Sequence, residues 1–295
     1  MTSHSVVPRV LSIAGTDPSG GAGTAADLKS ITAAGGYGMT VVTSLVAQNT
    51  HGVREIHTPP TAFLTAQLQA VSDDVVIDAI KTGMLGTVEV IETVAAWLDD
   101  QPPAVLVVDP VMVATSGDRL VDQQAEQAMI EFCARATVVT PNIDELAVLT
   151  GCQPAADEAQ ALHQASGWAS ATGVSVVVKT GHLRSDWTTN TWVCPDGARH
   201  PVYATRLAST STHGTGCSLS SALATRLGAD DSPDTALSWA TQWLHEAIDH
   251  GEALNVGSGH GPVDHSYRAR QLQGWTSEAQ SDEATLPTAV KGGSR

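Results

Sequence analysis

Four consecutive residues near the start of the last third of the chain have the composition of a phosphate-binding turn. The turn Gly214-Thr215-Gly216-Cys217 leads directly into a segment, Cys217 to Leu227, that we expect to be a helix. Backbone N–H groups at the start of a helix point toward a bound anion, and the helix dipole favours negative charge there. Phosphoryl transfer depends mainly on stabilising charge on the phosphoryl oxygens. The turn therefore predicts an anion hole for phosphoryl transfer, formed by Gly214, Thr215 and Gly216.

Cys217 ends this turn, at a helix N-terminus, where the pKa of a thiol tends to fall. A thiolate at that point would accept the proton of an attacking hydroxyl group, which makes Cys217 a candidate general base. The alternative is a small buried residue at a tight packing point. The sequence leaves both interpretations open.

A second glycine-rich turn follows the first expected strand, from Gly15 to Gly23. Four glycines in nine residues let the backbone approach a ligand closely. Gly21, Gly23 and Ala26 fit a loose dinucleotide fingerprint, but the second strand ends at Gln48-Asn49 without the acid that would hold a ribose. A dinucleotide-binding domain is therefore disfavoured.

Two polar residues near this turn each allow two interpretations. Asp27 lies in the first turn of the following helix, either to compensate the helix dipole or to accept a hydrogen bond from a substrate hydroxyl. Gln48 follows a strand, and its amide can pair with a heterocycle that carries an amino group and a ring nitrogen. A loop-capping amide is the alternative for Gln48.

Charged residues also follow the later strands. Asp109 ends an apolar strand, where a carboxylate is costly unless it is used, which suggests a metal or phosphate-proximal role. Asn142 and Glu145 stand at the start of a helix, as caps or as groups that order Mg²⁺ through water. Lys179 ends the Val176-Val177-Val178 strand, where it would meet a phosphate or simply be solvated.

These turns must be positioned by an α/β fold with a mostly parallel central sheet, because apolar strand patterns alternate with helical patterns along the chain. In such sheets ligands bind beyond the carboxyl ends of the strands. We expect one domain over residues 9–272, a flexible N-terminus over 1–8 and a disordered tail over 273–295. The expected strands are Val10–Ala14, Thr40–Ala47, Val75–Lys81, Ala104–Asp109, Thr137–Thr140 and Val174–Lys179, followed by a two-stranded excursion at Asn190–Val193 and Val202–Leu207.

Composition excludes several classes of partner. The 295 residues carry a formal net charge of −16, which disfavours nucleic acids and anionic membrane surfaces. No apolar stretch is long enough to span a bilayer, and the first residues do not resemble a signal peptide. The four cysteines show no C-x-x-C spacing, which is typical of reduced thiols in a cytoplasmic protein.

Together these segments resemble the hydroxymethylpyrimidine/phosphomethylpyrimidine kinases of thiamine biosynthesis, within the ribokinase-like superfamily, over roughly residues 9–272. The motifs that carry the resemblance are the glycine turn 14–23 with Ala26-Asp27-Leu28-Lys29, Leu45-Val46-Ala47-Gln48-Asn49-Thr50, Lys81-Thr82-Gly83-Met84-Leu85, Asp109-Pro110-Val111-Met112, Thr140-Pro141-Asn142 to Glu145, Thr212-His213-Gly214-Thr215-Gly216-Cys217 and His260-Gly261-Pro262. The resemblance implies a ribokinase-like three-layer sandwich and a homodimer.

The resemblance also implies roles for single residues, and these are expectations. Asp27 and Gln48 would bind the pyrimidine, and Gly15, Met84 and Val111 would form the pocket walls. ATP and Mg²⁺ would be held by Asp109, Asn142, Glu145, Lys179 and Thr212, with Asp109 and Glu145 on the metal side. Gly214, Thr215 and Gly216 would form the anion hole and Cys217 would be the base. A monovalent cation is a further possible requirement.

The implied reaction is ATP-dependent phosphorylation of 4-amino-5-hydroxymethyl-2-methylpyrimidine and then of its monophosphate. Two departures from the resemblance bear on it. Cys217 stands where most sugar kinases of the superfamily have Asp, and Thr115 stands where a lysine is more usual. The alternatives are a pyridoxal kinase, which Gln48 disfavours, and a pyrimidine-binding regulator without activity.

Overall fold

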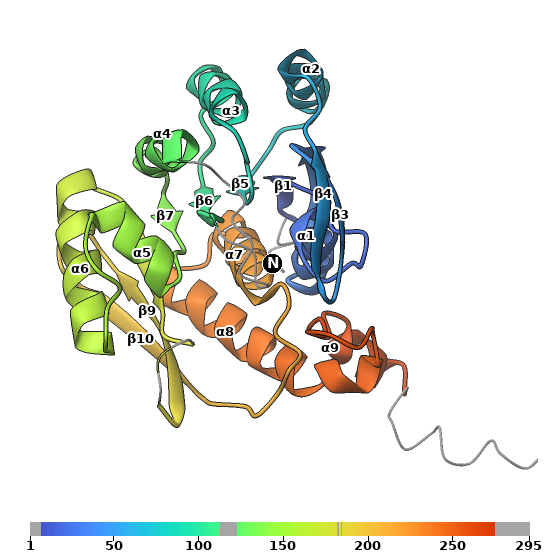
Figure 1. The fold of residues 1–295 in the computed structure, drawn as a ribbon, viewed down its shortest axis with the longest axis vertical. Coiled ribbons are helices and arrows are strands. Elements are labelled where there is room, and N and C mark those ends of the chain that lie inside the picture. The colour runs from blue at the N-terminus through green and yellow to red at the C-terminus, as the bar shows by residue number, and fades with distance from the viewer. Residues whose placement is uncertain (1–6, 113–122, 182, 184, 275–295) are drawn as a thin grey trace, which may run out of the picture.

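The computed structural model describes residues 7–112, 123–181, 183 and 185–274. Its central feature is an eight-stranded sheet with the strand order β10-β9-β8-β7-β6-β5-β1-β2 (Figure 1). The strands are β1 (Arg9–Ala14), β2 (Tyr37–Val42), β5 (Ala79–Thr82), β6 (Leu106–Val108), β7 (Val138–Val139), β8 (Ser175–Lys179), β9 (Trp187–Val193) and β10 (Arg199–Thr205). The prediction of an α/β fold with a mostly parallel sheet is confirmed.

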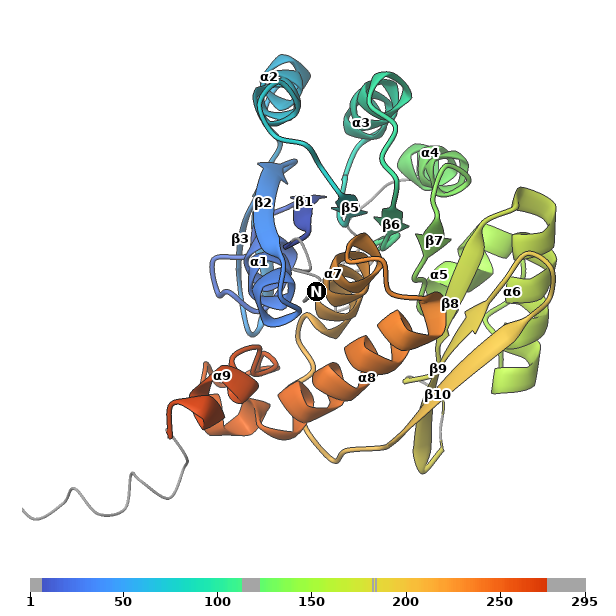
Figure 2. The ribbon, with the colours of Figure 1, turned by 180° about the vertical axis from the view of Figure 1, so that it is seen from behind.

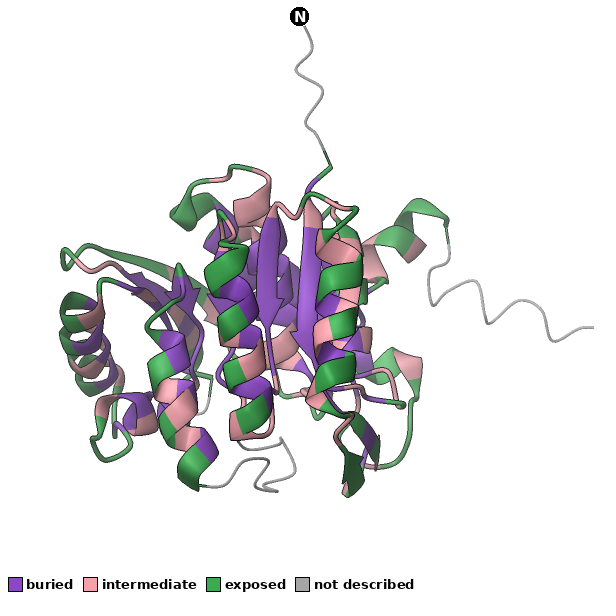
Figure 3. Cartoon of the chain, turned by 90° about the horizontal axis from the view of Figure 1, so that it is seen from above, coloured by how far each residue is buried: buried purple, intermediate pink, exposed green. Residues whose placement is uncertain are grey.

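Parallel pairing runs unbroken from β2 to β8, and β9 and β10 continue the sheet as an antiparallel hairpin. The apolar strands are buried on both faces because helices cover both, as the purple strands of Figure 3 show. Because the strands from β2 to β8 are parallel, their carboxyl ends meet at one edge of the sheet. The candidate site residues that follow these strands must gather at that edge.

Helices form the two outer layers. One face of the sheet packs against α2, α3, α4, α5 and α6, and the other against α1, α7 and α8 (Figures 1 and 2). Their bounds are α1 (Gly23–Ala33), α2 (Thr61–Ser72), α3 (Val88–Asp100), α4 (Gln123–Cys133), α5 (Ile143–Thr150), α6 (Glu158–Thr172), α7 (Thr215–Gly228) and α8 (Pro233–Asp249), followed by a 3₁₀ turn (Gly251–Leu254) and α9 (Tyr267–Leu272). This arrangement is a three-layer sandwich.

The segment expected as one strand over Thr40–Ala47 is two strands, which corrects that prediction. β2 ends at Val42, and β3 (Leu45–Asn49) leaves the main sheet to pair with β4 (Gly52–His57) in a separate two-stranded sheet. The chain turns at Thr43-Ser44, where Thr43 donates a hydrogen bond from its N–H to the Ala14 carbonyl and Ser44 accepts one from the Thr16 N–H. These bonds tie the turn to the end of β1 and carry β3 over the first glycine turn.

The strand expected over Val75–Lys81 begins only at Ala79. Asp78 precedes it and uses its side chain to bind the backbone N–H and guanidinium of Arg9, at 2.7 to 2.8 Å. The elements run from Arg9 to Leu272, and 9–272 stays the proposed domain. Thr115 and, within the predicted termini, residues 1–6 and 275–295 lie outside the described residues. Within the part of the chain that is described, no helix has both the length and the apolar character needed to cross a membrane.

Candidate active site

The predicted anion-binding turn lies against the first glycine turn. Gly214 caps α7 in a left-handed conformation, with φ 80°, and the first turn of the helix follows it. A Cβ atom on Gly214 would collide with the Gly21 carbonyl, and one on Gly21 would collide with the His213 ring. Glycine is required on both sides, so the two turns are packed backbone against backbone.

A buried carboxylate joins the same two turns. Asp17 accepts hydrogen bonds from the N–H and hydroxyl of Ser19, from the N–H of Ala22 and from Nε2 of His213, all at 2.7 to 2.8 Å. Burial alone would raise the pKa of Asp17, but the hydrogen bonds from His213 and Ser19 hold it below its usual range. Asp17 and His213 therefore fix the first glycine turn to the start of α7.

The start of α7 also faces a lysine–aspartate pair. A Cβ atom on Gly216 would lie 3.4 Å from Asp109 Oδ2 and 3.5 Å from Lys179 Nζ. Lys179 Nζ lies 3.3 Å from Asp109 Oδ1, which also accepts a 3.0 Å hydrogen bond from the Thr140 hydroxyl. Both of these contacts use Oδ1, so Oδ2 is turned toward Gly216. The structure thus brings together the anion turn, Asp109 and Lys179, as the sequence predicts.

Asn142 and Glu145 form a capping box at the start of α5. The Asn142 side chain accepts from the Glu145 N–H at 2.9 Å, and the Glu145 carboxylate accepts from the Asn142 N–H at 2.8 Å. Burial raises the pKa of Glu145 to about 7; Lys179 opposes this shift and Asp109 adds to it. The capping interpretation is confirmed, and Glu145 also lies within electrostatic reach of Asp109 and Lys179.

The carboxylates of this site could serve as ligands of a magnesium ion, but they do not surround it. Across residues 7–112, 123–181, 183 and 185–274 no group of three or more His, Cys, Asp or Glu side chains could hold a metal. Mg²⁺ usually takes one or two carboxylates, water and the substrate phosphates. Two carboxylates fit that pattern as metal ligands. They are Asp109, whose Oδ2 is turned toward Gly216, and the neighbouring Glu145.

The state of Cys217 differs from its prediction. Burial raises the pKa of the Cys217 thiol to about 11, although Lys81 and the backbone N–H of Gly23 act to lower it. The expectation that the helix start lowers this pKa is wrong, because the cost of burying a thiolate exceeds the benefit of the helix dipole. At neutral pH Cys217 is therefore a thiol.

Asp27 is fully buried rather than open to a ligand. Its carboxylate lies 2.8 and 3.0 Å from Lys81 Nζ and accepts further hydrogen bonds from the hydroxyls of Ser12, at 2.6 Å, and Ser221, at 2.7 Å. Four hydrogen bonds occupy both carboxylate oxygens. The structure thus makes Asp27 an ion-pair partner in the core, an arrangement that neither sequence-based interpretation included.

The expected pocket walls lie on the other side of the first glycine turn. A Cβ atom on Gly15 would lie 2.6 Å from Met84 Cε and 3.6 Å from Val46 Cγ2. Gln48 follows Val46 on β3, past a β-bulge between Ala47 and Gln48, and is half-buried. Among the residues that the structure describes, no hydrogen bond to the Gln48 amide is found, which leaves the amide available to a ligand.

The remaining predicted site residues are Val111 and Thr212. Val111 is half-buried and donates its N–H to the Asp109 carbonyl at 2.8 Å. Thr212 is half-buried before the anion turn, and its carbonyl accepts from the Thr215 N–H at 3.3 Å. Each is placed at the same edge of the sheet as Asp109 and Gly216.

Sequence reasoning missed two site residues. Lys81 is fully buried although it is charged, and His213 binds Asp17. A lysine within an apolar strand and a histidine next to a glycine turn were signals for them. Their partners lie 54 and 196 residues away in the chain, so the pairing itself was not visible in the sequence.

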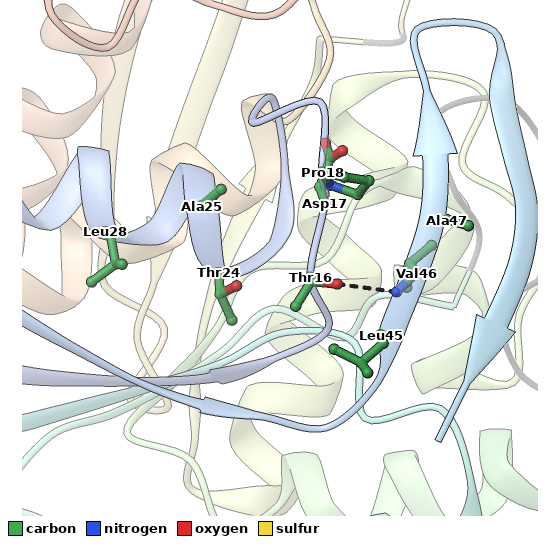
Figure 4. A pocket seen from close by; sticks show the side chains of 9 residues that line it. All are labelled: Thr16, Asp17, Pro18, Thr24, Ala25, Leu28, Leu45, Val46 and Ala47. Atoms are coloured by element: carbon green, nitrogen blue, oxygen red, sulfur yellow. Dashed lines mark hydrogen bonds between the residues drawn. The ribbon is translucent and has the colours of Figure 1, made fainter. Parts of the chain in front are cut away.

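A shallow groove of about 620 Å³ runs between α1 and β3, beside the first glycine turn. Figure 4 shows its side chains: Leu28, Ala25 and Thr24 project from α1 and Leu45 and Ala47 from β3, and the Thr16 hydroxyl accepts a 3.0 Å hydrogen bond from the Val46 N–H. Leu28 and Leu45 are exposed. The groove is mostly apolar, and its lining includes neither Asp109 nor Lys179.

Comparison with known proteins gives a consistent result. The model of the family described as phosphomethylpyrimidine kinase matches residues 17–264. The chain is 55% identical over 265 residues to the thiamine biosynthesis multifunctional protein ThiED of Corynebacterium efficiens, covering 90% of this chain and 36% of that protein. It is 39% identical over 267 residues to the hydroxymethylpyrimidine/phosphomethylpyrimidine kinase of Haemophilus influenzae, covering 88% of this chain and 97% of that one. The chain thus spans about a third of the length of the first relative and nearly all of the second.

Solved structures agree with these relatives. The fold is similar to a pyridoxal kinase of Bacillus subtilis in an ADP complex, with a TM-score of 0.81 and 29% identity, over 90% of this chain and 99% of that one. It is also similar to a phosphomethylpyrimidine kinase of Clostridium difficile, with a TM-score of 0.71 and 32% identity, over 82% of this chain and 99% of that one.

Proposed function

The chain belongs to the phosphomethylpyrimidine kinase family, and we propose that it transfers the γ-phosphoryl group of ATP to 4-amino-5-hydroxymethyl-2-methylpyrimidine. We further propose that it phosphorylates the resulting monophosphate to the diphosphate. The observation that carries the proposal is the placement of the start of α7, where Gly214 packs against the first glycine turn and Gly216 faces the Asp109–Lys179 pair. That placement puts backbone N–H groups and a lysine around one point.

The nucleotide side is proposed at the ends of β6, β7 and β8. Lys179 would contact the phosphates, and the N–H groups of Gly214, Thr215 and Gly216 would hold the phosphoryl oxygens during transfer. Asn142 and Thr212 border this space, as the resemblance predicts. Asp109 and Glu145 would hold Mg²⁺, which would neutralise charge on the phosphates. The ADP complex of the similar pyridoxal kinase supports ATP as the donor.

The pyrimidine is proposed to bind against Gly15, Met84 and Val46, with Val111 at the far side. An aminopyrimidine offers an amino donor beside a ring nitrogen acceptor, and the Gln48 amide can satisfy both at once. The resemblance assigns Asp27 to the pyrimidine, but its carboxylate is buried. It would act indirectly, by holding Ser221 and Lys81 in place.

Cys217 is the proposed acceptor of the hydroxyl proton. Because the thiol is protonated at neutral pH, it must lose its proton before it can act as a base. The reaction would then proceed as the substrate O–H proton passes to sulfur, the oxygen bonds to the γ-phosphorus, and the bond to the ADP oxygen breaks. A Cys217→Ala variant that keeps full turnover would remove the thiol from this scheme.

An assay of ATP consumption would test the function directly. Hydroxymethylpyrimidine, its monophosphate and pyridoxal would be compared side by side with the purified full chain. We expect kcat/KM to be highest for hydroxymethylpyrimidine and measurable for its monophosphate. Turnover of pyridoxal alone would contradict the proposal.

Pyridoxal phosphorylation is a second candidate, favoured by the high structural similarity to pyridoxal kinases. Gln48 discriminates the two substrates, because the pyridoxal ring lacks an amino group beside the ring nitrogen. A Gln48→Leu variant should lose hydroxymethylpyrimidine turnover and retain any turnover of pyridoxal. Equal losses for both substrates would mean that Gln48 does not select the ring.

A homodimer is the proposed assembly, through the groove between α1 and β3. A separate two-stranded sheet is marginal alone, and Leu28 and Leu45 expose apolar surface in the groove beside it. Light scattering should give twice the chain mass, and Leu45→Asp should give the single mass.

Since all four cysteines are free thiols, the reducing cytoplasm is the proposed compartment.

A further inference from the structure

Two helices begin side by side at the proposed transfer site. Gly23, at the start of α1, faces Cys217, near the start of α7, and its backbone N–H acts to lower the pKa of the thiol. One helical turn further along, the Ser221 hydroxyl donates to Asp27 Oδ1 at 2.7 Å. Residues four apart share a face of a helix, so Gly23 and Asp27 on α1 oppose Cys217 and Ser221 on α7. The Asp27 carboxylate therefore lies one layer beneath the Cys217 thiol.

Lys81 contacts Asp27 from a third element, β5. Its ammonium lies 2.8 and 3.0 Å from the two oxygens of Asp27, and neither side chain has any exposed area. A Cβ atom on Gly83 would be only 2.8 Å from Lys81 Nζ, so the ammonium is held between Asp27 and the Gly83 backbone. This lysine begins the motif Lys81-Thr82-Gly83-Met84-Leu85, and the proposed reaction assigns it no role.

The charges that act on Cys217 come from three directions. Lys81, from β5, favours the thiolate; Asp27, from α1, and Asp109, from the end of β6, oppose it. The effect of Lys81 on the pKa of Cys217 is the largest of the three. The Gly23 N–H adds a smaller favourable contribution, and Lys179 lies across Gly216, paired with Asp109. Lys81 thus supplies the dominant positive charge acting on the sulfur.

On the basis of the proposed kinase function, we propose that Lys81 is a positioning residue for phosphoryl transfer. Its ammonium, fixed by Asp27, stabilises the Cys217 thiolate from beneath α7 so that the sulfur can take the proton of the substrate hydroxyl. In that step the O–H bond breaks and an S–H bond forms, while the freed oxygen electron pair bonds to the γ-phosphorus. The electron pair of the broken phosphorus–oxygen bond leaves on ADP.

The rate of Cys217 alkylation by iodoacetamide, followed by mass spectrometry of the Cys217 peptide over a range of pH, tests this without any substrate. The variant Lys81→Met/Asp27→Asn removes both charges and leaves no buried charge unpaired. We expect its alkylation midpoint to move up by about half to one pH unit, which is roughly three- to tenfold less thiolate at a given pH. Asp27→Asn alone keeps the lysine and removes the opposing carboxylate, so its midpoint should move down.

Arg226→Met is the matched control, since Arg226 lies in the last turn of the same helix and pairs with Asp231. Its alkylation midpoint should stay at the wild-type value. Folding of each variant is checked by circular dichroism and thermal melting. A merely structural lysine would leave the midpoint unmoved in both Asp27 variants, or shift both in the same direction, and either result would overturn the proposal.

Activity separates this inference from the proposed function. The double variant should lower kcat for hydroxymethylpyrimidine about three- to tenfold near neutral pH, in proportion to the lost thiolate, with KM for ATP within about twofold. If the wild type shows no transfer to the pyrimidine while the alkylation midpoints move in opposite directions, the function is wrong and the effect of Lys81 on Cys217 stands. If transfer occurs and the midpoints do not move, the function stands and the role of Lys81 falls.

Discussion

Two lysine–aspartate pairs flank the start of α7, and they are built differently. Lys81 and Asp27 are wholly buried, 2.8 Å apart, and the carboxylate accepts four hydrogen bonds. Lys179 and Asp109 are 3.3 Å apart, the lysine keeps 15% of its side-chain area exposed, and Asp109 Oδ2 is turned toward Gly216. The first pair is saturated by the protein, whereas the second keeps groups available for a ligand. Proximity to the anion turn therefore does not by itself distinguish a structural ion pair from a ligand-binding one.

The largest expected effect breaks the saturated pair. Lys81→Met leaves the Asp27 carboxylate buried without its cation, so we expect the free energy of unfolding to fall by about 3–5 kcal/mol in urea denaturation. Lys179→Met should cost less, about 1–3 kcal/mol, because Lys179 is partly exposed, lies farther from its partner, and leaves Asp109 with the hydrogen bond from Thr140. Similar losses in the two variants would show that the pairs do not differ as described.

The second effect concerns turnover at the open pair. Lys179→Met should lower kcat for hydroxymethylpyrimidine by roughly 10²–10³-fold, the size of effect seen when one charge-stabilising group is removed from a transfer site. Arg226→Met, which removes a cation far along α7, should leave kcat within about twofold. A Lys179 variant that keeps wild-type turnover would remove this lysine from the site.

The third effect is a pH dependence next to the open pair. The pKa of Glu145 is raised from 4.5 to about 7, so between these values the folded protein binds more protons than the unfolded chain. Stability should therefore decrease as pH rises from about 4.5 to 7, by up to about 3 kcal/mol. Glu145→Gln should flatten this slope in urea titrations at several pH values. Lys81, whose pKa is raised above 10.5, stays charged throughout and adds no slope.

The smallest effect compares single hydrogen bonds on the two carboxylates. Ser221→Ala and Thr140→Val each remove one hydroxyl donor, to Asp27 and Asp109 respectively. Both should lower the free energy of unfolding by about 1 kcal/mol. Thr140→Val should also raise KM for ATP, since it loosens the carboxylate beside Gly216, whereas Ser221→Ala should leave KM for ATP unchanged. Identical kinetics in the two variants would weaken the distinction between the pairs.

The sequence predicted the parts of the site that depend on local pattern. Gly214-Thr215-Gly216, Asp109 and Lys179 each follow a strand or precede a helix, and parallel strands bring such ends together by rule. The helix expected from Cys217 to Leu227 is α7, and the two-stranded excursion expected at Asn190–Val193 and Val202–Leu207 is the antiparallel hairpin of β9 and β10, whose strands each begin three residues earlier. The family was also found this way, because its motifs lie in these same turns.

What could not be predicted depends on contacts between distant segments. The four hydrogen bonds on Asp27 come from β1, β5 and α7, and no local pattern reports them. The departure of β3 from the sheet depends on bonds from Thr43 to the end of β1 and from Thr16 to Ser44. The pKa of Cys217 depends on how deeply the thiol is buried, and helix position alone gave the wrong direction.

The packing of Gly21 against Gly214 has a consequence for anyone who wishes to evolve this protein toward new substrates. Because a side chain on either glycine would collide with the opposite turn, neither turn can change at these positions without the other, although 193 positions separate them. Libraries that randomise either turn alone should return mostly unfolded clones. Diversity is better introduced on β3 around Gln48, where the strand has already left the main sheet and Leu45 and Ala47 are exposed.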